Sequence, residues 1–207
     1  MNSKLLENIY LKKSIILDIL ILIIITIYLL FVQPSYIFNT FFLLLFVMYF
    51  GEFNLNKVKK NLKEPKIILI NYFWAFKIFL TFFLLEYGWI YNLLSNIDWG
   101  YDPQRFYEYS QNLIKTNWVV TDNLNYNGVT YFYAVVFYIF GINPYIPALI
   151  NNLITIIALL NLFNYLKVLN IKNVKYIWLF FLILLSPEAV WFDIITSREM
   201  LLASLLC

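Results

Sequence analysis

The sequence predicts an all-α polytopic membrane protein, and three observations support this class. Hydrophobic residues make up 62% of the chain and charged residues 13%, whereas soluble domains are about 45–50% apolar. The apolar residues gather in runs of about 20, long enough to cross a hydrocarbon core about 30 Å thick. Lysines cluster at the ends of these runs, where they orient a membrane protein. We expect about five full spans, an interfacial helix and a short last apolar run.

Residue counts exclude several kinds of chemistry. The net charge is only +3, and because the lysines lie at span ends we expect membrane lipids as partners and no nucleic acid. The chain has no histidine, which excludes the usual zinc sites, so we expect no cofactor; a divalent metal would need carboxylate ligands. A single cysteine, Cys207, excludes an internal disulfide.

Two apolar runs open the chain. Residues 14–33 are expected to be an uncleaved span, because the run is long for a signal peptide and lacks a small-x-small cleavage site. Asp18 lies near the start of this run, where we expect an interfacial carboxylate. Pro34 and Ser35 turn the chain into a second span at residues 36–53. We assign residues 1–66 as a two-span amino-terminal extension.

The densest lysine cluster of the chain follows the second span and is expected to form a cytoplasmic loop. Its lysines are Lys57, Lys59, Lys60, Lys63 and Lys66. The third span, residues 67–91, therefore runs outward. Lys77 and Glu86 interrupt this span, but they are too far apart to pair, about 14 Å along a helix axis.

A long polar segment, residues 96–126, follows the third span and is expected on the outer face, within an outer loop at 92–126. Asp102 followed by Pro103 is typical of a helix N-cap and first helical position, so we expect a surface helix to begin there. An aspartate at a membrane–water boundary is ionised at neutral pH and can act as a general base. The alternative is that Asp102 only caps the helix. The segment contains four carboxylates, Asp98, Asp102, Glu108 and Asp122.

The next apolar run, residues 126–140, is short and rich in tyrosine and phenylalanine, a composition typical of the membrane interface. If this run lies along the outer surface, residues 144–166 cross inward and the lysines that follow are cytoplasmic. If it spans the bilayer, those lysines lie outside. The positive-inside rule favours the first arrangement. The lysines concerned are Lys167, Lys172 and Lys175.

The carboxy-terminal part contains one further span. Residues 176–192 return outward, with Ser186 and Pro187 breaking or kinking the last turns. A short outer segment then leads into residues 200–207, an apolar run shorter than half a span. We therefore expect the chain to be part of a longer protein.

Three segments, within residues 72–206, carry a resemblance to a known family. DPQRFYEYSQNLIKTNW at 102–118 has an Asp after a span, then an Arg, an aromatic, a Glu and a Trp. An aromatic run ending YIFGIN is followed directly by a span, and SPEAVWFDIITSREM ends one span and opens the next with a basic–acidic pair. In this order the segments resemble the amino-terminal part of GT-C polytopic glycosyltransferases. They are similar to bacterial family-39-type enzymes, lipid A aminoarabinose transferases and protein O-mannosyltransferases.

The resemblance implies an activity and a site. The activity is transfer of a sugar, with inversion, from a polyprenyl-phosphate-linked donor to a glycan, lipid or protein acceptor on the outer face of the cytoplasmic membrane. Asp102 would be the catalytic base, with Asp98 as the alternative, and Arg198 would pair with the donor phosphate. The other candidate substrate-binding residues are Arg105, Glu108, Trp118 and Glu199.

The GT-C-like module would occupy residues 67–207, and the extension lies outside the resemblance. Where many relatives have Lys-Pro-Pro, this chain has Asn127, Gly128 and Val129, so neither the acceptor class nor a metal site is carried over. Two other classes fit the same composition. One is a polysaccharide polymerase or O-antigen-type ligase, and the other is a non-enzymatic permease-like protein, which would place charges or broken helices at the bilayer midplane.

Overall fold

A computed structural model of the chain describes residues 3–32, 34–62, 67–86, 102–120 and 128–168. The helices in these ranges are α1 (Ser3–Val32), a 3-10 turn η1 (Pro34–Tyr36), α2 (Ile37–Leu62), α3 (Ile67–Glu86), α5 (Asp102–Lys115), α6 (Gly128–Phe140) and α7 (Tyr145–Val168). The described residues contain no strand, so the predicted all-α class is confirmed for this part of the chain.

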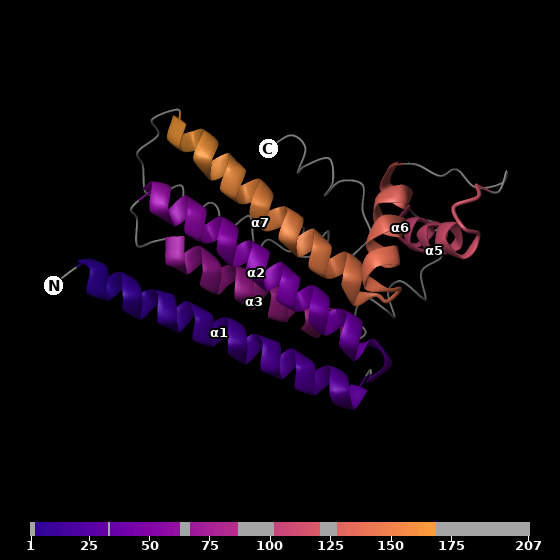
Figure 1. Cartoon of the computed structure of the whole chain (residues 1–207), viewed down its shortest axis with the longest axis horizontal. Helices are drawn as coiled ribbons and strands as arrows, with labels where there is room; N and C mark the ends of the chain where they lie inside the picture. The colour runs from indigo at the N-terminus through magenta and orange to yellow at the C-terminus, as the bar shows by residue number, and fades with distance from the viewer. Residues whose placement is uncertain (1–2, 33, 63–66, 87–101, 121–127, 169–207) are drawn as a thin grey trace.

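Four long helices lie side by side, and two shorter helices close one end of them (Figure 1). α1, α2 and α3 alternate in direction because at most four residues connect each helix to the next. α7 packs on α2 and α3. α5 and α6 pack on each other at the end where α1 turns into α2. The start of α1 and the ends of α2 and α7 lie at the opposite end.

The first helix is longer than predicted, and this changes the place of Asp18. The polar start of the chain ends the apolar run but not the helix, because Leu, Glu and Lys have high helix propensity. α1 therefore begins at Ser3, and Asp18 lies near its middle with only 9% of its surface exposed. Asp18 is thus packed between helices, and its interfacial position stays a prediction.

The lysine-rich segment after the second apolar run is also helical where the structure describes it. α2 continues to Leu62 and so includes Lys57, Lys59 and Lys60, which corrects the expected loop. Pro65 follows shortly after, and a proline disfavours helical backbone at the residue before it. The helix continues beyond the apolar run that predicted the second span.

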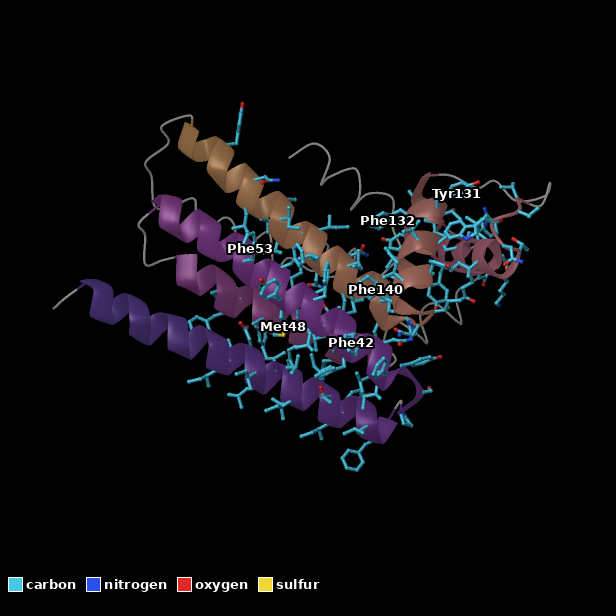
Figure 2. The ribbon with its side chains drawn as sticks, viewed as in Figure 1. Phe42, Met48, Phe53, Tyr131, Phe132 and Phe140 are labelled. Carbon is cyan, nitrogen blue, oxygen red and sulfur yellow. The ribbon has the colours of Figure 1, made fainter. Side chains whose placement is uncertain are left out.

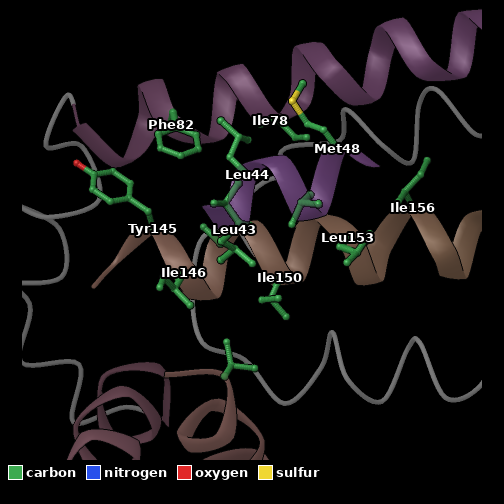
Figure 3. Close-up of a cluster of buried hydrophobic side chains, with 14 of the residues drawn as sticks. Leu43, Leu44, Met48, Ile78, Phe82, Tyr145, Ile146, Ile150, Leu153 and Ile156 are labelled. Carbon is green, nitrogen blue, oxygen red and sulfur yellow. The ribbon is translucent and has the colours of Figure 1, made fainter. Parts of the chain in front are cut away.

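The core of the bundle lies between α2, α3 and α7 (Figure 3). Phe82 of α3 stacks on Tyr145 of α7, with ring centroids 5.1 Å apart and 10° between the ring planes. Between membrane helices such contacts stabilise through van der Waals packing. The residues labelled in Figure 3 are Leu43, Leu44, Met48, Ile78, Phe82, Tyr145, Ile146, Ile150, Leu153 and Ile156.

The outward faces of α1 and α2 are apolar and exposed. Phe42 and Phe53 belong to the exposed face of α2, whereas Met48 of the same helix is buried (Figure 2). The exposed side chains are Ile16, Ile19, Leu20, Ile23, Ile24, Ile27, Leu30 and Phe31 on α1, and Phe38, Phe42, Leu45, Phe46, Tyr49, Phe50 and Phe53 on α2. Soluble monomers rarely expose continuous apolar patches of more than a few hundred Å², about 300–600 Å² at most.

Length and composition give one or two candidate membrane spans among the described residues. Pro34–Gly51 is long and apolar enough to cross a membrane, and α6 with α7 passes the same test only if the bent pair is one span. The apolar parts of α1 and α3, Ile16–Phe31 and Tyr72–Leu84, are shorter. Residues 176–192 and 200–207, expected as a span and a partial span, lie outside the described residues.

α2 and α3 come into close contact at Gly51. Trp74 of α3 is fully buried there, and a Cβ atom added at Gly51 would overlap the six-membered ring of the Trp74 indole. The absent side chain of Gly51 therefore provides the space that the indole fills.

We expect Gly51→Ala to lower the free energy of unfolding by about 1–3 kcal/mol, because the new methyl group overpacks the Trp74 site. Gly128→Ala is the matched control, since a Cβ at Gly128 meets no heavy atom within 4 Å. Gly128 is the first residue of α6, where helix propensity counts less than in the interior, so this control should change the free energy of unfolding by less than about 1 kcal/mol. Thermal unfolding in detergent measures both variants. Equal effects would contradict the close α2–α3 contact.

Candidate functional site

The site predicted from the sequence centres on α5, which begins at Asp102 as expected. A proline suits the first turn of a helix because its missing N–H has no partner there to lose. α5 is amphipathic. Its buried face carries Phe106, Ser110 and Leu113, which are three or four residues apart. The opposite face exposes Arg105, Glu108, Asn112 and Lys115.

α6 holds the buried face of α5. The hydroxyl of Ser110 lies 2.9 Å from the backbone oxygen of Thr130 in α6 and 2.5 Å from that of Phe106 in its own helix. A serine hydroxyl has one hydrogen, so the two carbonyl groups share it. Tyr107 meets Phe137 edge to face, with ring centroids 5.1 Å apart. α5 is thereby fixed on α6, and we call this pair of helices the two-helix cap.

The two-helix cap is joined to the bundle by a sharp turn after α6. The chain bends by 112° between α6 and α7, so α6 runs across the end of the bundle. Gly141 adopts φ 90°, which favours glycine, and its N–H donates to Phe137 O at 2.8 Å. A Cβ atom there would also overlap the side chain of Asn39 in α2.

Asn143, two residues before the start of α7, is the N-cap of this helix. Its Oδ1 accepts hydrogen bonds from the N–H groups of Tyr145 and Ile146, at 3.0 and 3.2 Å. Its Nδ2 donates to Thr40 Oγ1 of α2 at 3.4 Å. In the next turn of α7, Asn151 Oδ1 accepts a bond of 2.7 Å from the hydroxyl of Tyr133 in α6. These buried bonds set the orientation of α6 on the bundle.

α5 ends in two consecutive left-handed residues, Asn117 at φ 51° and Trp118 at φ 66°. Trp118 N–H donates to Leu113 O at 2.8 Å and Asn117 N–H to Ile114 O at 3.1 Å, the bonds of a Schellman motif. Left-handed backbone costs about 1–2 kcal/mol per residue, less for asparagine. The result is that the exposed Trp118 ring meets Tyr138 of α6 edge to face at 6.0 Å.

The structure brings some of the predicted site residues together and separates others. Arg105 and Glu108 are exposed one turn apart on α5, and Asp102 begins the same helix three positions before Arg105. Trp118 lies beyond the other end of α5, which is about 10 Å along the helix axis from Glu108. The remaining predicted residues, Asp98, Arg198 and Glu199, lie outside the described residues.

The structure also identifies residues that the sequence did not single out. Tyr138 supports Trp118, and Ser110 fixes α5 to α6. A serine in the middle of an apolar helix face was the available signal for the second contact. Among the described residues, no group of three or more Asp, Glu, Cys or His side chains could hold a metal ion.

Comparison with protein-family models, with curated proteins and with solved structures finds no match for this chain. The residues of the chain itself define the site as an amphipathic helix with a polar exposed face, held across one end of an apolar helical bundle.

The left-handed end of α5 gives a stability prediction. We expect Asn117→Gly to be neutral or to stabilise by up to about 1 kcal/mol, because glycine adopts φ 51° without strain. Asn117→Val should lower the free energy of unfolding by about 1–3 kcal/mol. Asn112→Val is the matched control: it changes an exposed helical asparagine and should cost less than about 0.5 kcal/mol. Similar losses for both valine variants in thermal unfolding would contradict the left-handed assignment.

Proposed function

We propose that this chain belongs to a multi-pass glycosyltransferase of the cytoplasmic membrane. Its reaction would move a sugar from a polyprenyl-phosphate-linked donor to a glycan, lipid or protein acceptor. The observation that supports this best is the position of α5. The helix begins at Asp102, is held by α6 across one end of an apolar bundle and keeps its polar face exposed.

Two features support a membrane location. The exposed apolar faces of α1 and α2 favour a hydrocarbon environment. Lysines lie in the first turn of α1, the last turns of α2 and the last turn of α7, all at the end of the bundle opposite the two-helix cap. By the positive-inside rule that end faces the cytoplasm and the two-helix cap faces outward. In this arrangement α1, α2, α3 and α7 are four of about five spans, and α6 lies in the outer interface.

In the proposed reaction Asp102 acts as the general base. Its carboxylate accepts the proton of the acceptor hydroxyl while the acceptor oxygen attacks the anomeric carbon of the donor sugar. The bond from that carbon to the phosphate oxygen breaks, and the polyprenyl phosphate leaves with the electron pair. Attack opposite the leaving group inverts the anomeric centre. Arg198 would pair with the phosphate of the donor.

Other residues would bind rather than react. The guanidinium of Arg105 and the carboxylate of Glu108 can hydrogen-bond to sugar hydroxyl groups, and both are exposed on the helix that Asp102 begins. Trp118 and Tyr138 present aromatic rings beyond the other end of α5, where they can pack on an apolar sugar face or a lipid chain. Glu199 is a further candidate for substrate binding, whereas Asp98 is the alternative general base.

One observation favours a second class, the permease-like protein. Asp18 and Lys77 are buried in the middle of α1 and α3, and charged residues at mid-bilayer depth often mark a transport pathway. A polysaccharide polymerase or ligase is the other alternative. Transfer of radiolabelled sugar from a lipid-linked donor distinguishes enzymes from a permease, which would move solute across vesicles without transferring sugar.

The role of Asp102 is tested by Asp102→Asn in the natural gene product, with sugar transfer from lipid-linked donor as the measurement. Loss of a general base lowers turnover about 100- to 10,000-fold, whereas asparagine is itself a good N-cap and preserves the helix start. We expect a large turnover defect with unchanged yield of folded protein. Near-normal turnover would leave Asp102 as a cap only.

Asp98→Asn is the matched variant for that assay, because it removes a carboxylate from the same segment. We expect it to retain most of the transfer activity. A defect in Asp98→Asn together with normal Asp102→Asn would move the base to Asp98. Wild-type activity in both variants would remove both residues from the proposed chemistry.

A further inference from the structure

Two opposite charges are buried in the interior of neighbouring helices, away from the two-helix cap. Asp18 of α1 is 9% exposed and Lys77 of α3 is fully buried. α1 and α3 pack on each other. Neither residue has a role in the proposed sugar transfer, and Asp18 belongs to the extension that the family resemblance leaves out.

Helix geometry places the two residues at similar depth. Asp18 lies fourteen residues before the end of α1, about 21 Å from the α1–α2 turn at 1.5 Å per residue. α2 is about 39 Å long, and Lys77 lies ten residues, about 15 Å, into α3 from the far end of α2. Lys77 is therefore about 24 Å from the same turn, within one helical turn of Asp18.

Each residue also lies on the buried face of its helix. Asp18 continues the row formed by Ile21, Ile25 and Leu29 on α1, all at most 6% exposed. Lys77 lies between Trp74 and Thr81 on α3, both fully buried. Charges in such surroundings are retained when an opposite charge neutralises them.

We propose that Asp18 and Lys77 form an ion pair across the α1–α3 contact. The carboxylate of Asp18, in the amino-terminal extension, then neutralises the buried lysine of α3. The other buried side chains described on α1 are aliphatic and tolerate sliding, whereas a slip of one turn would move Asp18 by about 5.4 Å. The pair therefore sets the register of the extension on the module, and the extension is part of the folded core.

Charge-pair variants of the whole chain test this inference by thermal unfolding in lipid nanodiscs. Asp18→Asn and Lys77→Met each leave one buried charge, and we expect each to lower Tm by about 10 °C. The double variant Asp18→Leu/Lys77→Met removes both charges and should return to within about 3 °C of the wild type. Lys115→Gln, which removes an exposed charge on α5, is the control and should shift Tm by less than about 2 °C.

A Tm loss in the double variant equal to the sum of the single losses would overturn the pair. If the single variants fail to fold, the yield of folded double variant decides: recovery supports the pair, and the same failure overturns it. A second measurement does not depend on charge. In a Cys207→Ser background, Asp18→Cys/Lys77→Cys should be joined by a short bifunctional thiol reagent. The control pair Asp18→Cys/Phe83→Cys, which uses an exposed α3 position, should not; absence of the first cross-link also overturns the proposal.

Discussion

The sharp turn between α6 and α7 is the constraint on which the two-helix cap depends. Gly141 accepts a left-handed backbone where Asn39 leaves no room for a side chain, and Asn143 caps α7 while bonding to Thr40. Both contacts reach the first turns of α2, so the turn is fixed to the bundle. α5 is held in turn by the contacts of Ser110 and Tyr107 with α6. The direction of the helix that begins at Asp102 therefore follows from a turn some forty residues later.

Strong local signals allowed the sequence to predict much of this fold. The Asp102–Pro103 pair marked the start of α5, and the aromatic run ending at Phe140 was expected as a separate helix before α7. The lengths of α1 and α2 could not be read from hydropathy, because polar residues with high helix propensity continue both helices beyond their apolar runs. The burial of Asp18 depends on how α1 packs on its neighbours, which no local pattern predicts. Contacts such as Tyr133–Asn151 depend on tertiary packing and leave no local pattern.

Polar side chains occur in two places in this fold: on the exposed face of α5 and buried between the long helices. The polar face of α5 is exposed at one end of the bundle. Inside the bundle, Asn152 Nδ2 of α7 donates to Thr81 Oγ1 of α3 at 3.2 Å, and Lys77 lies one turn from Thr81. Buried polar groups of this kind specify which helices pack together, because each needs its own partner. Among the described helices, α1 packs on α2 and α3, and α7 packs on α2, α3 and α6.

The central claim is that the two-helix cap lies outside a membrane whose inner side is contacted by the lysine-bearing helix ends. Site-directed thiol labelling tests it most directly, with single cysteines at Asn112→Cys on α5 and Lys60→Cys near the end of α2, in a Cys207→Ser background. An impermeant maleimide should label Asn112→Cys in intact cells, and Lys60→Cys only in inside-out vesicles. Labelling of both positions from the same side would contradict the account.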